Sequence, residues 1–499
     1  MPFAGPRPLR VAIIGGGLSG LTLGQLLQDV PHISVVLYER SKGPIDRLSG
    51  YRVMISAWTL KNLKGTLRQT VWNRIAQSIG SQPPEGQEIC FMKSNGEALY
   101  TWAPEEVQEQ YSTSRWKLRE GLLEESDSFA RFGKMFERYK ELPNGSIRVY
   151  FTDGTSDECD LLVGADGINS RVRKQLLPDA KIVTSDQVVI YFKIALTPAT
   201  LALMQTNSGV MAFCPNNQHI IVHSWQNPLK PWATEYNAHD IEPSESFIMF
   251  GYSSTRDCFL NRTNIPEELS REELKGELIA RAKRDKNVHP HFAALAERCI
   301  TNTAYLHVVK NCDAIKPWES RSVTLVGDAV FNMATTLGKG ANCALLDAIS
   351  LAETLSLPPK KILSQPLLRR ELRKFTVDNI DRRLRERQRS GLLQNLMFFG
   401  NSRFKSYFRQ KLLKAALGYI EDPKTESGRR ATKERLQKRR PGTAISQVSY
   451  ASSSGSSSVL SGETFLEREF GMVKIYDPDV VSVNSGVQSS GSTVSVTSR

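Results

Sequence analysis

Three glycine-bearing segments contain the residues whose types and spacing could bind a dinucleotide. They read GGGLSG at Gly15–Gly20, GADGINSRVR at Gly164–Arg173 and GDAVFNMATTLGKGAN at Gly327–Asn342. In the first segment, Gly15 permits a tight turn, Gly17 lets backbone N–H groups approach a pyrophosphate, and Gly20 lets a helix pack closely on a strand. This G-x-G-x-x-G spacing alone would fit any dinucleotide.

The elements around the first segment must hold a phosphate at the start of a helix. An apolar run at 9–14 predicts a buried parallel strand, and leucines at 21, 23, 26 and 27 predict the helix that follows. The N-terminus of such a helix favours negative charge. A second predicted strand, Ile33–Tyr38, ends at Glu39, where an acidic residue bonds a ribose hydroxyl. Glu39, with its neighbour Arg40, is assigned to the cofactor site, and the carboxylate favours FAD or NAD over NADP.

The second and third segments place aspartates at the ends of two further predicted strands. Asp166 follows the strand Leu161–Val163, and Asp328 follows the strand Val323–Val326. Open α/β sheets bind ligands at the carboxyl ends of their strands. The third segment then opens another helix, whose N-terminus could stabilise negative charge, through Gly338, Gly340, Ala341 and Asn342.

Taken together, over residues 8–400, the motifs resemble those of the single-component (group A) FAD-dependent monooxygenases of the aromatic-hydroxylase type. The resemblance implies that the first motif holds the ADP half of FAD and that Asp328 bonds the ribityl chain. It implies that Asp166 and Gly167 serve both FAD and NAD(P)H. A further match, R-x-x-L-x-x-x-L at Arg115–Leu122, implies that Arg115 contacts FAD.

The third motif also departs from the commonest form in that family. Phe331 stands in place of histidine, Thr335 in place of proline, and Lys339 in place of glutamine. The proline normally packs beside the flavin ring, so its replacement leaves open how oxygen is activated. Lys339 could strengthen the positive field at the flavin, or it could be solvated.

The resemblance implies an enzyme that reduces FAD with NADPH or NADH. A flavin C4a-hydroperoxide formed with O2 would then hydroxylate or epoxidise an organic substrate, aromatic or polyketide-like, with fungal secondary metabolism as a suggested setting. An FAD-dependent reductase or dehydrogenase of the same fold is an alternative, to which Phe331 and Thr335 give weight. A flavin-bound regulatory protein whose basic, serine-rich tail recruits partners is another.

The sequence offers fewer candidate residues for contacting the substrate than for binding the cofactor. Arg52 follows the second strand and could hold an acidic or phenolic substrate, pair with an FAD phosphate, or lie on the surface. Tyr191 and Lys193 alternate on one predicted strand, and could face either the pocket or solvent. Arg52 and Tyr191 are therefore the catalytic candidates, and no residue is identified as a general base.

Composition divides the chain into five parts. We expect an FAD-binding domain at 1–178, a β-sheet substrate domain at 179–305, a return to the FAD unit at 306–360, a helical region at 361–422 and a disordered tail at 423–499. The fold class expected is α/β, with a Rossmann-like FAD-binding domain interleaved with a sheet domain.

Charge and cysteine usage limit the partners and the compartment. Much of the net charge of +13 lies in the basic run Lys424–Arg440, which is typical of a solvated tail, so we expect no nucleic-acid partner. Arg429-Arg430 with Lys438–Arg440 leaves nuclear import open. No apolar run could span a membrane, although Leu392–Leu417 could touch a membrane surface. Seven scattered cysteines favour a cytoplasmic location and no metal site.

Overall fold

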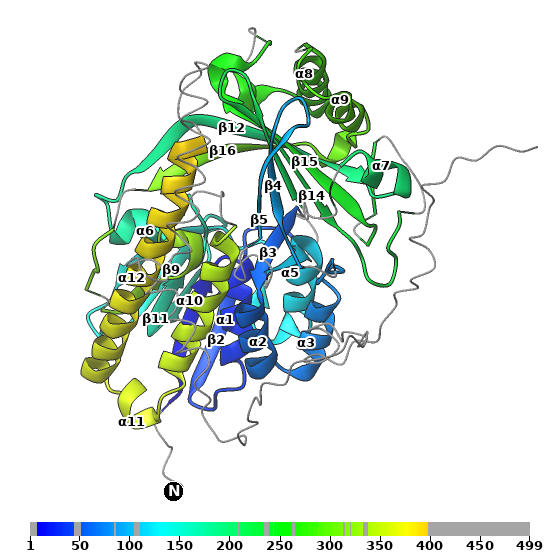
Figure 1. The fold of residues 1–499 in the computed structure, drawn as a ribbon. Coiled ribbons are helices and arrows are strands. Elements are labelled where there is room, and N and C mark those ends of the chain that lie inside the picture. The colour runs from blue at the N-terminus through cyan, green and yellow to red at the C-terminus, as the bar shows by residue number, and fades with distance from the viewer. Residues whose placement is uncertain are drawn as a thin grey trace, which may run out of the picture. The chain divides into compact units, whose positions relative to one another are not determined.

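The computed structural model describes residues 7–397, apart from gaps at 44–50, 84–85, 104–109, 205, 207–208, 234–238, 243, 262–264, 285, 313–314, 320 and 333–337. The tail at 423–499, its basic run and residues 398–422 therefore lie outside the described residues, as does Thr335. The predicted α/β fold class is confirmed, because a parallel sheet carries the glycine motifs and is joined to a second, larger sheet (Figure 1).

The parallel sheet brings the three glycine motifs to one edge. Its order is β17-β11-β1-β2-β7, with bounds β1 Leu9–Ile14, β2 Ile33–Tyr38, β7 Ala130–Arg131, β11 Leu161–Gly164 and β17 Val323–Leu325. The apolar strands β1 and β11 are almost wholly buried, as expected of a parallel sheet. Since neighbouring parallel strands end at the same edge, Gly15, Asp166 and Asp328 lie beside one another in the sheet order.

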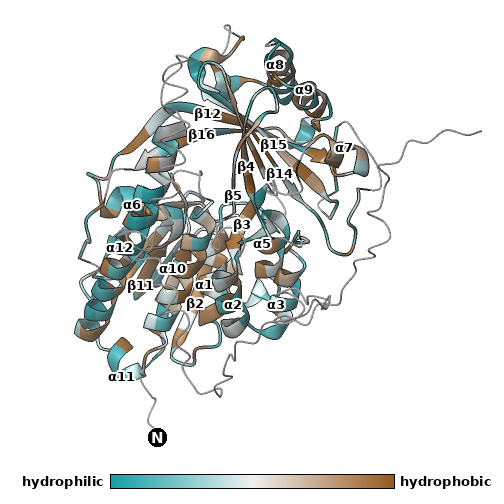
Figure 2. Cartoon of the chain, in the orientation of Figure 1, coloured by the Kyte–Doolittle hydropathy of each residue, from teal (hydrophilic) through white to brown (hydrophobic). Residues whose placement is uncertain are grey.

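Three helices pack near these motifs: α1 Leu18–Leu27, α10 Gly340–Leu355 and α12 Gln365–Met397. Helix α10 contacts both of the others (Figure 1). Leu21, Leu23 and Leu27 of α1 are fully buried, as their spacing predicts. Figure 2 shows hydrophobic residues concentrated in the strands, whereas α12 is largely hydrophilic.

Two smaller antiparallel sheets and further helices complete this part. The first sheet pairs β8 Phe136–Glu141, β9 Ile147–Phe151 and β10 Ser156–Cys159, and the second pairs β3 Arg52–Ser56 with β6 Gln110–Ser114. The turn between the antiparallel strands β9 and β10 contains Gly154, which has a φ of +82°. The other helices are α2 Ala57–Thr66, α3 Gln69–Ala76, α5 Arg115–Leu123, α6 Arg171–Leu176 and α11 Pro359–Ile362.

A seven-stranded sheet forms the second layer of the molecule. Its order is β16-β12-β15-β14-β13-β4-β5, with bounds β4 Ile89–Lys93, β5 Ala98–Trp102, β12 Ile182–Ala195, β13 Gly209–Cys214, β14 Gln218–Trp225, β15 Phe247–Thr255 and β16 Tyr305–Cys312. Strands β4 and β5 come from the segment 1–178, and most of β16 comes from 306–360. The sheet therefore draws on three stretches of chain and not on 179–305 alone, because strands distant in sequence pair in space.

The two faces of this sheet have different partners. Helices α8 Arg271–Arg284 and α9 Pro290–Glu297 pack on one face, over a core that includes Ile190, Phe192 and Phe250. Because strand side chains alternate, the neighbouring residues Tyr191 and Met249 point to the opposite face. The short helix α7 Pro198–Ala202 follows β12. Within the part of the chain that the structure describes, no helix has both the length and the apolarity to cross a membrane.

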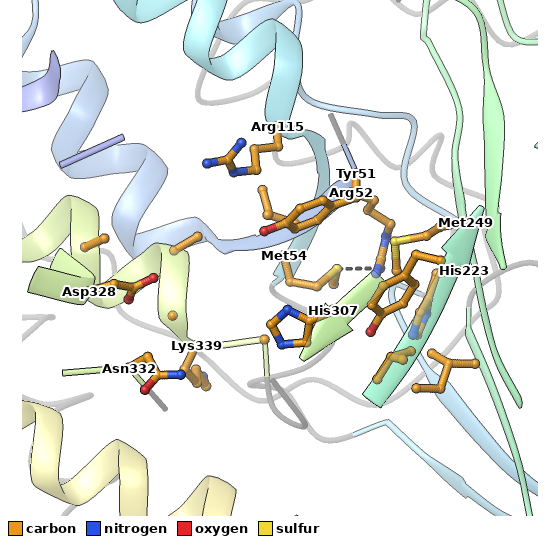
Figure 3. Close-up of a pocket in the computed structure, with 18 of the residues that line it drawn as sticks. Tyr51, Arg52, Met54, Arg115, His223, Met249, His307, Asp328, Asn332 and Lys339 are labelled. Carbon is orange, nitrogen blue, oxygen red and sulfur yellow. Dashed lines mark hydrogen bonds between the residues drawn. The ribbon is translucent and has the colours of Figure 1, made fainter. Parts of the chain in front are cut away.

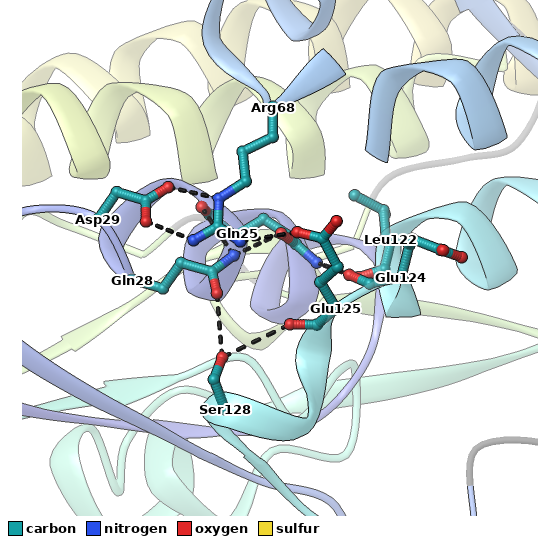
Figure 4. Close-up of polar contacts among 8 residues, drawn as sticks. All are labelled: Gln25, Gln28, Asp29, Arg68, Leu122, Glu124, Glu125 and Ser128. Carbon is teal, nitrogen blue, oxygen red and sulfur yellow. Dashed lines mark hydrogen bonds and ion pairs between the residues drawn. The ribbon is translucent and has the colours of Figure 1, made fainter. Parts of the chain in front are cut away.

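A polar cluster joins α1 to the C-terminal end of α5 and the residues just after it (Figure 4). The buried Gln25 side chain donates to the carbonyl oxygens of Leu122 and Glu124, at 3.0 and 2.6 Å. Above it, the exposed Arg68 pairs with Asp29, and also with the Glu125 carboxylate at 2.8 Å. Gln25 therefore makes its hydrogen bonds inside the protein, whereas Arg68 makes its ion pairs at the surface.

Replacing Gln25 by leucine is expected to lower the free energy of unfolding by about 1–3 kcal/mol, because one buried and one half-buried carbonyl oxygen lose their donor. Arg68→Met is the matched control, and it should change that free energy by less than about 1 kcal/mol, because its ion pairs are exposed. Urea unfolding of both variants measures the difference. Equal losses in the two variants would contradict the assignment.

Candidate functional site

A cavity of about 500 Å³ is lined by residues from both large sheets. One end is formed by the glycine motifs of the parallel sheet and the other by a face of the seven-stranded sheet. Figure 3 shows Asp328 at one end, Arg52, His223 and Met249 at the other, and His307 between them. The cavity therefore connects the predicted cofactor residues with the predicted substrate residues.

The first glycine motif is shaped by close backbone contacts. Gly15 has a φ of +111°, and a Cβ at Gly20 would lie 2.0 Å from the Gly15 carbonyl oxygen. Gly17 precedes the first turn of α1, lines the cavity, and would have no atom within 4 Å of a Cβ. The start of α1 is therefore open to a ligand, and its N–H groups suit an anion such as a pyrophosphate.

Glu39 lies behind this loop and does not line the cavity. Its carboxylate accepts hydrogen bonds from Gly16 N at 2.6 Å and from Ser41 N and Oγ at 2.9 Å. Burial alone would raise the pKa of Glu39, but these hydrogen bonds and the charge of Arg119 hold it below its usual value. Arg40 is exposed and away from the cavity, so its predicted contact with a cofactor stays a prediction.

The second motif contributes Gly167 to the cavity wall, with a φ of +78°. Asp166 instead turns toward α6, where its carboxylate accepts from Ser170 Oγ at 2.5 Å and from Arg171 N at 2.7 Å. The buried Arg173 of α6 donates to the Asp328 and Ala329 carbonyl oxygens, at 3.2 and 2.8 Å. Helix α6 thus ties the second motif to the third.

Asp328 is exposed to the cavity and yet lies deep inside the protein. Burial raises the pKa of its carboxyl, while the charges of Arg383 and Arg115 oppose that rise. Among the described residues, no group donates a hydrogen bond to this carboxylate. An acceptor left without a partner at a cavity wall suits a ligand hydroxyl, which is the chemistry of a ribityl chain.

A buried ion-pair network supports the loop that holds Asp328. The Asp347 carboxylate of α10 accepts from Gly327 N at 2.9 Å, and it pairs with Arg382 and Arg383 of α12 at 2.7 Å each. Arg383 also donates to the Phe331 carbonyl oxygen at 2.8 Å. Phe331 is fully buried and does not line the cavity, so the change from histidine alters this packed region and not the cavity wall.

The start of α10 forms the floor of the same end of the cavity. Gly338, Lys339, Gly340 and Ala341 line it. The predicted cofactor residue Asn342 does not, because its side chain is engaged with protein groups. It accepts from Ser56 N at 2.8 Å and donates to the Met54 carbonyl oxygen at 2.8 Å. Asn342 therefore fixes β3 against α10.

Arg115 lies at the start of α5, as the R-x-x-L-x-x-x-L motif predicts, and it lines the cavity. Its guanidinium carbon is 5.5 Å from the centroid of the Tyr51 ring, and Tyr51 stacks on Tyr305 at 6.0 Å. Leu118 and Leu122 are fully buried. The motif thus places a cation over the Tyr51 ring at the cavity wall (Figure 3).

The sheet end of the cavity is apolar and aromatic. Tyr191 and His223 fit on the sheet because their cross-strand neighbours are glycines; a Cβ at Gly251 would come within 2.6 Å of the Tyr191 ring, and one at Gly209 within 2.5 Å of His223 Nδ1. Lys193, two residues beyond Tyr191, does not line the cavity. The same face also contributes Ile89, Trp102, Val189, Met211, Ile221, Met249, Tyr305, His307 and Val309, together with the polar side chains of Gln187 and Ser253.

Arg52 lies on β3 and reaches the sheet end of the cavity (Figure 3). It is 7% exposed, which excludes the surface position that the sequence left open. Its Nε donates to Ser112 Oγ at 2.6 Å, and its Nη2 contacts Met54 Sδ. Burial lowers the pKa of Arg52 to about 9, so the guanidinium remains charged at neutral pH.

Four polar residues that support the site were not anticipated from the sequence: Arg119, Arg173, Asp347 and Arg383. Arg119 donates to the Gly16 carbonyl oxygen at 3.1 Å, and the other three hold the second and third motifs. A signal was present for one of them, because Asp347 is a charge among apolar residues in the middle of α10. Its partner Arg383 could not be recognised among the many arginines of α12.

Several known proteins are similar to this chain in sequence. Residues 8–245 match the FAD binding domain family. The chain is 27% identical over 382 residues to a dual O-methyltransferase/FAD-dependent monooxygenase of Phaeosphaeria nodorum, covering 70% of this chain and 40% of that protein. It is 26% identical over 401 residues to a 3-amino-4-hydroxybenzoate 2-monooxygenase of Streptomyces platensis, covering 76% and 88%. The chain thus spans only about two fifths of the length of the dual-function relatives.

Solved structures share the fold. Klebsiella pneumoniae HpxO complexed with FAD and uric acid aligns with a TM-score of 0.62 and 17% identity, covering 86% of this chain and 96% of that one. The 2,6-dihydroxypyridine-3-hydroxylase of Arthrobacter nicotinovorans aligns with a TM-score of 0.62 and 18% identity, covering 80% and 94%. At these identities, the likeness shows the architecture alone.

Proposed function

We propose that this chain, which carries an FAD binding domain and is related to FAD-dependent monooxygenases, is itself such an enzyme. It would use NADPH or NADH and O2 to hydroxylate or epoxidise an organic substrate, aromatic or polyketide-like. The observation that carries the proposal is the continuous cavity that joins the glycine-motif edge of one sheet to an aromatic face of the other. A cofactor at the first end would meet a substrate at the second.

The residues at the first end suit FAD. Gly17 and the start of α1 would hold the pyrophosphate, and Asp328 would accept a bond from a ribityl hydroxyl. Glu39, which lies outside the cavity wall, would bond a hydroxyl of the ribose. Arg115 lines the cavity between these groups and the sheet. When bound, FAD supplies hydride acceptance from a nicotinamide and the activation of oxygen.

The chain's own residues would orient the reactants and exclude water. The N-terminus of α10 presents a positive dipole to the cavity, and Lys339 beside it adds to this field. Met211, Ile221 and Met249 make the sheet end apolar, which keeps competing water away from the reacting groups. The G-x-G-x-x-G motif occurs once, at Gly15–Gly20, which suits brief docking of NAD(P)H and not permanent binding.

The test of the proposal uses the purified full chain. Its absorption spectrum shows whether flavin is bound, and the oxidation of NADPH and NADH is then followed while O2 and peroxide are monitored. We expect bound flavin and oxygen-dependent consumption of NAD(P)H.

Asp328→Asn should retain less flavin, because the acceptor for the ribityl chain is weakened. Asp179→Asn, at an exposed aspartate, is the matched control and should retain as much as the unmodified chain.

Other outcomes would favour the alternatives. Flavin that NAD(P)H reduces but that O2 reoxidises slowly would indicate a reductase or dehydrogenase. The burial of Phe331 removes one reason for that alternative, because the residue does not face the cavity. Bound flavin with no NAD(P)H oxidation would favour a regulatory protein. A colourless protein that cannot take up FAD would overturn the proposal.

A further inference from the structure

We propose that the sheet end of the cavity is an anion-binding pocket, in which Arg52 pairs with a carboxylate or another anionic oxygen of a conjugated substrate. The inference rests on the proposed function, because it names the substrate class of that same site. It would assign to Arg52 one of the roles that the sequence left open. Four observations support it: the fixed position of Arg52, the missing counter-charge, the neutral neighbour and the flat apolar walls.

The guanidinium of Arg52 is held in one orientation. Its Nε bonds Ser112 Oγ at 2.6 Å, and Ser112 in turn donates to the Ser224 carbonyl oxygen at 2.8 Å. The thioether of Met54 is only a weak acceptor for Nη2. The rest of the guanidinium fork has no bond to the described residues, so it is available to a ligand in the cavity that Arg52 lines.

The charge of Arg52 has no protein counter-ion among the described residues. Two carboxylates line the cavity, but neither forms an ion pair with it. Asp328 lies at the opposite end (Figure 3), and Glu88 accepts a hydrogen bond from Thr206 Oγ1 at 3.1 Å. Buried charges in proteins are normally paired, because an isolated charge in a low-dielectric setting is costly. An anionic ligand would complete the pair.

Arg52 is the cation beside His223. Arg115 and Arg389 also line the cavity, but Arg115 contacts the Tyr51 ring and Arg389 pairs with Glu386 at 3.4 Å. Burial and the charge of Arg52 itself hold the pKa of His223 well below its usual value, so the imidazole is neutral at physiological pH. The ammonium of Lys193 lies 4.4 Å from the centroid of the Phe247 ring and outside the cavity wall. A ligand anion would therefore be directed to one position.

The walls around Arg52 suit a flat conjugated body. The rings of Tyr191, His223 and Trp102 and the thioethers of Met211 and Met249 line this end. Aromatic rings and methionine sulfur both pack favourably on planar π systems. A volume of about 500 Å³ is within the range of small-molecule sites. The pocket thus combines one cation with a broad apolar surface.

The test compares two probes of equal shape, 1-hydroxy-2-naphthoate and 1-hydroxy-2-naphthamide, by calorimetric titration of the FAD-loaded full chain. We expect the carboxylate to bind about 10- to 100-fold more tightly than the amide, as a charge-assisted hydrogen bond predicts. Arg52→Met should abolish this preference, and Arg52→Lys should keep part of it, because the charge remains but the fork is lost. Arg298→Met, which removes an exposed cation of α9's end, should leave the preference intact.

Three outcomes would overturn the inference: equal binding of both probes by the unmodified chain, an unchanged preference in Arg52→Met, or loss of FAD from Arg52→Met and Arg52→Lys, which would assign Arg52 to the cofactor. If Arg52→Met does not fold, Arg52→Lys and Ser112→Ala decide, since both should reduce the preference. The measurement needs no turnover. A carboxylate preference without NAD(P)H oxidation would support the anion-binding pocket and reject the proposed function. NAD(P)H oxidation without a carboxylate preference would support the proposed function and reject the pocket.

Discussion

Gly17→Ala is expected to weaken FAD binding roughly 10- to 100-fold while leaving the stability of the FAD-free protein nearly unchanged. The new methyl group would have no protein atom within 4 Å, so the fold has room for it. The same methyl group would stand at the start of α1, where backbone N–H groups must approach a pyrophosphate. Titration of the apoprotein with FAD, followed by flavin fluorescence, measures the affinity.

Gly20→Ala is the matched variant, and the opposite result is expected. Its Cβ would lie 2.0 Å from the Gly15 carbonyl oxygen, a contact with backbone that only a shift of α1 can relieve. We expect a loss of about 3 kcal/mol in the free energy of unfolding of the apoprotein, with FAD binding lost as a consequence. If Gly17→Ala destabilised the apoprotein as much as Gly20→Ala, the first motif would be structural and not a ligand site.

Asp347→Ala is expected to lower the free energy of unfolding by about 3–5 kcal/mol, because it leaves the fully buried Arg383 without its counter-ion. It also removes the acceptor for Gly327 N, so the loop that carries Asp328 should loosen. Weaker retention of FAD should accompany the loss of stability. Urea unfolding and flavin content of the same preparation measure the two effects.

The control for Asp347→Ala is Glu371→Ala. Glu371 forms an ion pair with the exposed Arg370, and both residues lie on α12. Exposed ion pairs contribute less than about 1 kcal/mol, so little change is expected. Asp347→Asn should fall between the two, since it keeps an acceptor but removes the charge. Similar losses for Asp347→Ala and Glu371→Ala would show that the buried network contributes little.

The cofactor end of the site could be predicted from the sequence because its determinants are local. A glycine spacing after an apolar strand encodes a turn and a helix start, and β1, β2, β11 and α1 form where these patterns place them. Asp328, Gly167 and Arg115 line the cavity for the same reason. The roles of Asp166 and Asn342 were less accessible, because their side chains could turn toward either a ligand or the protein, and both bond protein groups.

The substrate end was decided by tertiary structure. The seven-stranded sheet recruits β4, β5 and β16 from outside the segment whose composition indicated it, since strand pairing depends on which distant segments meet. The position of Arg52 was open among substrate, phosphate and surface until β3 paired with β6 and buried it. Likewise, Gly209 and Gly251 make room for His223 and Tyr191 only because the strand register sets them side by side.

The sequence by itself therefore determined the α/β class, the order of the motifs and the dinucleotide end of the site. These depend on short patterns in which each residue's role is set by its near neighbours. Only the tertiary structure decided which polar groups are buried together, such as Asp347 with Arg383, and which charge has no counter-ion among the residues that the structure describes, as at Arg52. Burial and the presence of a counter-ion depend on residues far away in the chain, and no local pattern records them.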